Sequence, residues 1–288
     1  MLPGMASKPR ITIVGAGNLG SALAVALRGA GYGIEWVVGH GTKSLQRAQA
    51  LGKKVNARAS TGVPQQIDSE LIWFCVPDSQ IAAAAKSFSR AIPWTRKFAF
   101  HSSGALTSDE LAILRKRGAM VASVHPLMTF VRGSRPSLAG VPFAVEGDAA
   151  AVKLARQVIA DLGGRVHSIS KKEKAAYHAW GTFASPLFTS LLAVSEQVAS
   201  MAGVKNKSAR QRMIPILLQT LANYASFGPA GAFSGPIVRG DVDTVKRHLR
   251  VLRGSPEAHR AYQALALAAV KYLPSKNKAA LRRALTAK

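Results

Sequence analysis

The sequence has few acidic residues, a single cysteine and no long stretch that is apolar throughout. Of its 288 residues, 39 are Lys or Arg and only 14 are Asp or Glu, which gives a formal net charge of +25. The lone Cys75 excludes a disulfide within the chain and favours a reducing compartment. Its place in the apolar run 71–76 indicates a buried small side chain. The N-terminal segment lacks the apolar core of a secretory signal, so we expect a cytoplasmic protein.

Motifs that are missing disfavour several classes of protein. There is no G-x-S-x-G nucleophile elbow of serine hydrolases, and no H-E-x-x-H or paired cysteines, so we expect no bound metal. The uncharged stretch 175–195 approaches the length of a membrane span. Its polar residues and Pro186 favour a buried helix instead, and we expect no membrane contact.

The positive charge is spread over both halves of the chain, with no basic tail or Lys/Arg tract. A zinc-finger spacing and an aromatic-rich RNA-binding signature are also missing, so we expect no specific nucleic acid partner. Diffuse positive charge is typical of solubility or of attraction for an anionic substrate and cofactor.

The most informative segment is 11–20, which reads I-T-I-V-G-A-G-N-L-G and leads from an apolar strand into a helix. In this context the first glycine allows a tight turn, the second lets a pyrophosphate approach the backbone, and the third lets the helix pack closely on the strand. The free N–H groups at the helix start then favour the phosphates. A glycine-rich turn without a ligand is the alternative. The predicted dinucleotide site comprises Gly15, Gly17, Asn18, Leu19 and Gly20.

The end of the second strand, 34–38, indicates which dinucleotide binds. NAD-preferring sites usually have an acidic residue there, but the nearby Glu35 lies at the start of the strand. The strand is followed by His40, Thr42 and Lys43, donors and a cation that suit a 2′-phosphate. We therefore expect NADP(H) in preference to NAD(H). The same loop also fits a helix cap, with Thr42 as the N-cap of a helix from Lys43 to Leu51.

The rest of the first half alternates between strands and helices, which predicts a doubly wound Rossmann sheet. Asp78 is expected to cap a helix that ends near Ser89, and Thr107-x-x-Glu110 is a capping box for a helix over 108–116. A helix over 148–162 lies between the last two strands. The further strands are predicted at 71–76, 97–101, 119–124, 142–145 and 165–169.

Polar clusters follow these strands, and in such a sheet ligands bind beyond the carboxyl ends of the strands. We expect the segment Val76, Pro77 and Asp78, together with His101, to contact the cofactor. Ser102 and Ser103 fit either a contact with nicotinamide or substrate, or a turn with Gly104. His125 fits either the nicotinamide face or a hydrogen bond to the backbone.

From Lys171 onward the pattern changes to long helices, and strand signals nearly vanish. We place a domain boundary near residue 169, with a Rossmann domain at 8–168 and an all-α domain at 169–288. The predicted helices are 171–201, 208–227, 241–252 and 256–272, with a Gly/Pro-rich break over 228–236.

This arrangement resembles the 6-phosphogluconate dehydrogenase-like and β-hydroxyacid dehydrogenase superfamily. The closer resemblance is to a family of Rossmann-like oxidoreductases with a helical C-terminal domain of unknown function. It implies an NADP-dependent reductase fold, a helical domain that usually builds a homodimer, and, from related reductases, a small anionic carboxylate, imine or carbonyl substrate. The motifs that carry it are G-A-G-N-L-G (15–20), V-P-D (76–78), H-S-S-G-A-L (101–106), V-H-P-L-M-T-F (124–130), K-A-A-Y-H-A (174–179) and G-P-I-V-R-G-D (235–241).

Lys174 and His178 are four residues apart, so they project from one face of a helix. A Lys near a His can polarise a carbonyl while the imidazole moves the proton. The hydroxyacid dehydrogenases place a Lys, and four residues later an Asn, on the corresponding helix. The alternative is a surface Lys with His178 packed structurally. Arg239 fits either a clamp for a substrate carboxylate or a structural ion pair.

Two functions of different class fit these residues. The first is an NADP(H)-dependent oxidoreductase, with His178, Lys174, Ser102 and His125 as catalytic candidates and Ser103 and Arg239 as substrate contacts. The second is a sensor or regulatory protein that binds NADP(H) without turnover. Pro186 favours the second, because it stands where the closer family commonly has Asn and removes a possible substrate contact.

Overall fold

The computed structural model describes residues 8–134, 136–204 and 206–287, without the side chains of Thr42, Lys43 and Asn206. The chain forms two compact units; the first ends at Thr182 and the second begins at Phe183. The helix α6 (Lys174–Thr182) belongs to the first unit, although it follows the predicted boundary at 169. Each unit is described by itself below.

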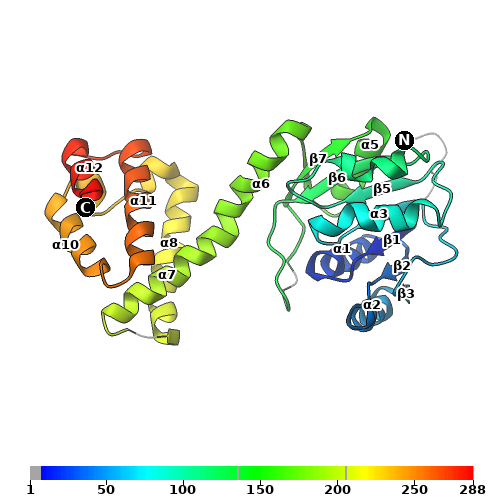
Figure 1. Cartoon of the computed structure of the whole chain (residues 1–288), viewed down its shortest axis with the longest axis horizontal. Coiled ribbons are helices and arrows are strands. Elements are labelled where there is room, and N and C mark those ends of the chain that lie inside the picture. Colours follow the sequence, from blue (N-terminus) through cyan, green and yellow to red (C-terminus); the bar gives the residue numbers. More distant parts are fainter. Residues whose placement is uncertain (1–7, 135, 205, 288) are drawn as a thin grey trace. The chain divides into compact units, whose positions relative to one another are not determined.

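The first unit is built on one eight-stranded sheet with the order β3-β2-β1-β4-β5-β6-β7-β8 (Figure 1). All neighbours are parallel except β6 and β7, which pair antiparallel. The strands are β1 (Ile11–Val14), β2 (Ile34–Val38), β3 (Arg58–Ser60), β4 (Leu71–Phe74), β5 (Phe98–His101), β6 (Met120–Pro126), β7 (Pro142–Gly147) and β8 (Arg165–Ser168).

The sheet is covered on both faces, as strands that are apolar throughout require. In β4 every residue is buried, and successive side chains enter different cores. Leu71 and Trp73 pack in the core that contains α1 (Asn18–Gly29), α2 (Thr42–Val55) and α5 (Ala149–Asp161). Ile72 and Phe74 pack in the other core, with α3 (Ile81–Ser89) and α4 (Ala112–Arg115). The predicted doubly wound fold is confirmed.

Three of the predicted helix starts form differently. Helix α2 begins at Thr42 with Gly41 as its N-cap residue, so the predicted cap at Thr42 is wrong. Asp78 opens a short 3₁₀ turn, η1 (Asp78–Gln80), because its carboxylate accepts a hydrogen bond from distant Ser103 instead of from the helix. Thr107 bonds Asp109, without the predicted return bond from Glu110, and begins a 3₁₀ turn, η2 (Ser108–Leu111).

The second unit is helical, as predicted. From α6 the chain continues through a π-helical turn, η4 (Phe183–Leu187), that contains Pro186, into α7 (Phe188–Met201). Helix α8 (Asn206–Ala232) is interrupted at Gly228, whose φ of 66° is left-handed, at the start of the predicted break. The remaining helices are α9 (Pro236–Arg239), α10 (Val242–Leu252), α11 (Pro256–Tyr272) and α12 (Lys278–Thr286).

The core of the second unit joins α10, α11 and α12 through Val245, Leu249, Val270 and Leu281. Asp241 caps α10 by accepting from the backbone N–H of Thr244. Across both units, none of the described helices combines the length and the apolar character that a membrane span would need.

Candidate active site

The glycine turn lies between β1 and α1, and its three glycines meet very different surroundings. At Gly15, with φ of 110°, a Cβ atom would lie 2.5 Å from the carbonyl oxygen of Cys75, the residue after β4. At Gly20 it would overlap the carbonyl oxygen of Gly15. At Gly17 it would meet nothing within 4 Å. The outer glycines thus allow close packing of the backbone, and the middle one leaves open space beside it, as dinucleotide binding requires.

The start of α1 is suited to an anion. Gly17 is its N-cap residue, no side chain caps it, and its first turn contains no acidic residue. The side-chain amide of Asn18 donates to the carbonyl of Phe130 at 3.1 Å and thereby links the turn to the loop after β6. The unpaired N–H groups and the dipole of such a helix start attract phosphate.

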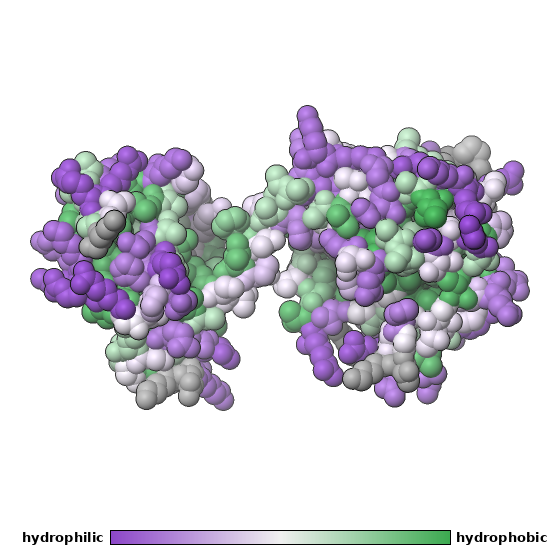
Figure 2. Space-filling view, in the orientation of Figure 1, coloured by the Kyte–Doolittle hydropathy of each residue, from purple (hydrophilic) through white to green (hydrophobic). Residues whose placement is uncertain are grey.

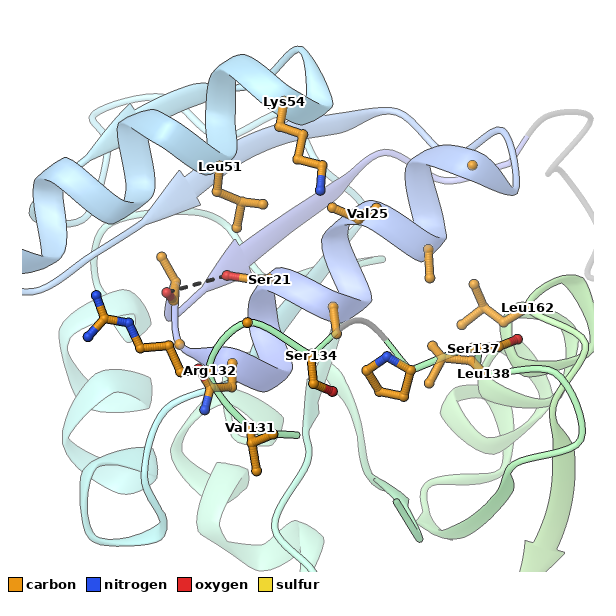
Figure 3. Close-up of a pocket in the computed structure, with 18 of the residues that line it drawn as sticks. Ser21, Val25, Leu51, Lys54, Val131, Arg132, Ser134, Ser137, Leu138 and Leu162 are labelled. Carbon is orange, nitrogen blue, oxygen red and sulfur yellow. Dashed lines mark hydrogen bonds between the residues drawn. The ribbon is translucent and has the colours of Figure 1, made fainter. Parts of the chain in front are cut away.

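A cavity of about 840 Å³ begins at Gly17 and Asn18 and runs along α1 (Figure 3). Three cationic residues line it: Arg47 and Lys54 from α2, and Arg132 from the loop after β6. None of these three cations was among the predicted site residues. The sequence could have pointed to Arg47 as a phosphate contact, because it lies one helical turn after Lys43. No sequence pattern points to Arg132.

The end of β2 is free of acidic side chains. Glu35 accepts hydrogen bonds from the backbone and hydroxyl of Ser69 and pairs with Arg58. Burial alone would raise the pKa of Glu35, but these hydrogen bonds lower it overall, so the carboxylate is charged and already engaged. His40 is exposed, and the predicted side chains of Thr42 and Lys43 lie outside the described residues.

The loops after β4 and β5 are joined by one hydrogen bond. The hydroxyl of Ser103 donates to Asp78 at 2.8 Å and accepts from the backbone N–H groups of Ala105 and Leu106. Val76 packs against the α3 core, whereas Pro77 is exposed. Ser103 therefore shapes both loops at the predicted cofactor edge of the sheet.

The polar side-chain atoms of His101 and Ser102 form hydrogen bonds within the protein. The Nε2 of His101 bonds the carbonyl of Thr107 at 2.9 Å, and its Nδ1 accepts from the N–H of Ser103 at 3.1 Å. Burial lowers the pKa of His101 to about 4, so this ring is neutral near pH 7. The hydroxyl of Ser102 accepts from the indole N–H of Trp73 at 2.8 Å. Their predicted roles at a ligand remain predictions.

His125, on β6, has a defined tautomer. Its Nδ1 lies 3.0 Å from the carbonyl oxygen of Ser102, which can only accept, so Nδ1 carries a proton. Burial lowers the pKa of His125, and the nearby charge of Lys174 acts in the same direction. In the neutral ring Nε2 is therefore a free acceptor. A Cβ atom on Gly104 would lie 2.9 Å from this Nε2.

Lys174 is buried, with only 1% of its surface exposed, so it is not a surface lysine. Its ammonium donates to the hydroxyl of Ser123 at 2.7 Å and to the carbonyl of Ser103 at 3.0 Å. No carboxylate of the described residues lies within ion-pair distance of it. Burial lowers its pKa, which favours release of the proton.

His178 lies one helical turn after Lys174 and is half-exposed. Its ring centre is 5.8 Å from that of His125, with the ring planes at 83°. A Cβ atom on Gly104 would overlap the Cδ2 atom of His178. The structure thus brings Lys174, His125 and His178 together around Gly104; we call these four residues the Gly104 cluster.

Arg239 is the one predicted site residue in the second unit, where it ends the short helix α9. The structure places none of the other site residues beside it within that unit. Nor do three or more His, Cys, Asp or Glu side chains come together as metal ligands in the parts of the chain that are described.

Comparison with known families assigns both halves of the sequence. Residues 5–126 match the Rossmann-like domain family, and residues 141–269 match DUF2520, a domain of unknown function. The chain is a Rossmann-like domain followed by a DUF2520 domain. The predicted resemblance is thereby confirmed. No curated protein is similar enough in sequence to this DUF2520 protein to count as a relative.

Solved structures share the fold over nearly the whole chain. A Bacteroides fragilis protein described as a candidate NADP oxidoreductase has 21% identity and a TM-score of 0.77, over 91% of this chain and 97% of its own. An imine reductase from Pseudomonas sp. has 23% identity and a TM-score of 0.63, over 97% and 100%. A reductive aminase from Aspergillus terreus, in complex with NADPH and ethyl-5-oxohexanoate, has 17% identity and a TM-score of 0.66, over 96% and 99%.

Proposed function

We propose that this protein is an NADP(H)-dependent oxidoreductase that acts on a small anionic carbonyl, hydroxy or imino compound. The observation that carries the proposal is the placement of two features at the carboxyl edge of one sheet. The open glycine turn follows β1, and the Gly104 cluster gathers at the ends of β5 and β6. Proteins of the same fold include an imine reductase and a reductive aminase in complex with NADPH, which agrees with this reading.

The residues present fit a nicotinamide dinucleotide. The backbone of the Gly15–Gly20 turn would hold the pyrophosphate, because only Gly17 leaves space beside it. His40, Thr42 and Lys43, with Arg47, would hold a 2′-phosphate, and the segment 76–78 with His101 would border the nicotinamide half. Glu35 is already bonded to Ser69 and Arg58, which favours NADP(H) over NAD(H). The chemistry that this cofactor supplies when bound is hydride transfer.

The Gly104 cluster supplies the proton that must accompany a hydride. We assign proton transfer to His178, because its ring is partly exposed, makes no hydrogen bond within the described residues and stands beside a second imidazole. The free Nε2 of His125 is oriented to take up or return a proton. Lys174 is buried one helical turn before His178 and donates to the carbonyl of Ser103, and its lowered pKa favours release of a proton. Ser102 fixes His125 through its carbonyl group.

A second candidate function is a sensor that binds NADP(H) without turnover. The burial of Lys174 favours it, since both described contacts of its ammonium are within the protein. Pro186 favours it too, because it occupies the π-helical turn that follows α6. The experiment below separates the two.

We further propose a homodimer formed through the helical domain. Helix α8 exposes a series of large apolar side chains, and an exposed apolar patch of this kind is typical of an interaction surface. A second copy of the same surface is the simplest partner of matching chemistry. The side chains are Ile214, Ile216, Leu218, Leu221, Tyr224 and Phe227. A cytoplasmic location is part of the same proposal.

The test has two steps. Calorimetry should show that NADPH binds at least about tenfold more tightly than NADH. Carbonyl and imine compounds with a carboxylate are then screened for oxidation of NADPH by absorbance. His178→Ala and Lys174→Met should abolish any activity found, whereas His167→Ala, an exposed histidine on β8, should not. Tight NADPH binding without turnover of any compound would favour the sensor; absence of binding would refute both functions.

A further inference from the structure

The second unit contains a cavity of about 510 Å³ that is formed by α10, the start of α11 and the end of α12. Its walls are strongly basic, and no carboxylate of the described residues lines it. In Figure 2 hydrophilic side chains gather over the part of the helical unit that Figure 1 labels α10. The polar lining consists of Lys246, Arg250, Arg253, His259 and Arg260. We call this the basic cavity.

The spacing of the cations on α10 explains why they converge. Lys246, Arg250 and Arg253 are separated by four and three residues, so they lie along one face of the helix. The adjacent Val245 and Leu249 are buried in the core of the unit and hold the helix in place. The cationic face is thus held in place by packing.

In the described part of the chain, the protein places almost no carboxylates beside these cations. Arg260 pairs with Glu257 at 2.9 Å, but both side chains are about 70% exposed, so the pair contributes little. Among the described residues, no carboxylate lies within ion-pair distance of Lys246, Arg250 or Arg253. Like charges at these spacings repel one another and destabilise a helix. A bound anion would relieve this repulsion.

We propose that the basic cavity binds a compact anion that carries two or more phosphate groups. The guanidinium groups of Arg250, Arg253 and Arg260 present paired donors that match phosphate oxygens. The cavity volume lies in the range of small-molecule sites. Its apolar lining, Leu249, Pro256, Ala284 and Ala287, offers contact for a sugar or base beside the phosphates. An inorganic polyphosphate chain and a nucleoside polyphosphate share this chemistry.

The site is independent of the proposed dinucleotide site, because the glycine turn belongs to the first unit and the basic cavity to the second. A compact ligand is favoured over a nucleic acid, since the cations surround one cavity instead of following an extended stripe. The site also gives part of the chain's large positive charge a specific role.

The experiment measures binding of tripolyphosphate and of ATP to the full chain by calorimetry at about 150 mM salt, where diffuse attraction is screened. Arg250→Gln and Arg253→Gln should each weaken tripolyphosphate binding at least about fivefold. The matched control is Arg247→Gln, on the same helix but lining a different, apolar cavity; it should change affinity less than about twofold. ATP binding more tightly than tripolyphosphate would identify a nucleoside ligand, and equal affinity the phosphate chain alone.

A second readout uses only the wild-type protein. Tripolyphosphate should slow hydrogen exchange in α10 and α11 and raise the midpoint of thermal unfolding. Absence of binding at millimolar tripolyphosphate would overturn the proposal, as would equal weakening by Arg247→Gln and Arg250→Gln. Affinity that rises steadily with the length of a single-stranded oligonucleotide would identify a nucleic acid surface and would also overturn it.

Discussion

Replacement of Gly104 by alanine tests the Gly104 cluster with the smallest possible change. The φ angle of Gly104 is not left-handed, so alanine can adopt the same backbone conformation. The added methyl group would overlap the Cδ2 atom of His178 and lie 2.9 Å from the Nε2 of His125. The effect of the substitution is therefore steric and falls on the two histidines.

The size of the effect follows from which neighbour can move. Overpacking of a buried site costs about 1–3 kcal/mol. For a unit of this size, that corresponds to a fall of roughly 3–9 °C in the unfolding midpoint. Within the described residues the ring of His178 makes no hydrogen bond, whereas Nδ1 of His125 is bonded to the carbonyl of Ser102. We therefore expect His178 to rotate away and the stability loss to be at the low end. Displacement of a catalytic group by about 1 Å lowers the rate on the order of 100-fold.

The assay combines turnover with cofactor binding. Gly104→Ala should lower kcat about 100-fold while NADPH affinity changes less than about twofold. Gly62→Ala is the matched control, because a Cβ atom there meets nothing within 4 Å and its φ is also not left-handed. Nuclear magnetic resonance of the imidazole nitrogens would show the displacement of His178 directly. Full activity with unchanged histidine signals in Gly104→Ala would show that the two histidines beside Gly104 do not take part in turnover.

Three further predictions concern the cofactor edge of the sheet. Gly20→Ala should destabilise the first unit by about 3 kcal/mol, because its methyl group meets the Gly15 carbonyl. Gly17→Ala should leave stability unchanged within about 0.5 kcal/mol and weaken NADPH binding at least about tenfold. Chemical denaturation measures the first effect and calorimetry the second. Arg47→Ala should weaken the binding of NADPH about tenfold and that of NADH less than about twofold. The control Arg28→Ala, on α1 but outside the lining of the cavity, should change the binding of neither cofactor. An equal loss of affinity for both cofactors would contradict a 2′-phosphate contact. Because the pKa of His101 is about 4 in the folded protein and 6.5 when unfolded, the unfolded chain binds the proton first, and the stability of the first unit should fall as the pH drops from 6.5 to about 4. Urea unfolding across this range should show a weaker pH dependence in His101→Gln.

Local spacing was enough to predict the glycine turn, the doubly wound sheet and the helical second half. Each of these depends on residues that are close in sequence. The strand β3 (Arg58–Ser60) was missed because three residues carry no periodic signal, and it forms only by pairing with β2. The cap expected at Asp78 did not form because Ser103, 25 residues away, takes its carboxylate.

In the candidate site, too, local spacing predicted some features, whereas contacts between distant segments produced the others. The four-residue spacing of Lys174 and His178 predicted a shared helical face, but it could not show that Lys174 is buried against Ser103 and Ser123. The contact of Gly104 with both histidines joins segments 21 and 74 residues away, so no local pattern could reveal it. Arg132 lines the cavity along α1 from a loop after β6, again through tertiary structure alone.

A structure of the protein in complex with NADP⁺ would show whether the cofactor reaches the Gly104 cluster, through the distance between the nicotinamide C4 atom and the nearest ring nitrogen of His178. We expect a pyrophosphate against the backbone at Gly17 and a distance of roughly 5–7 Å, which leaves room for one reacting carbonyl or imine group. A nicotinamide ring far from the Gly104 cluster, or a glycine turn closed by the protein's own side chains, would contradict this expectation.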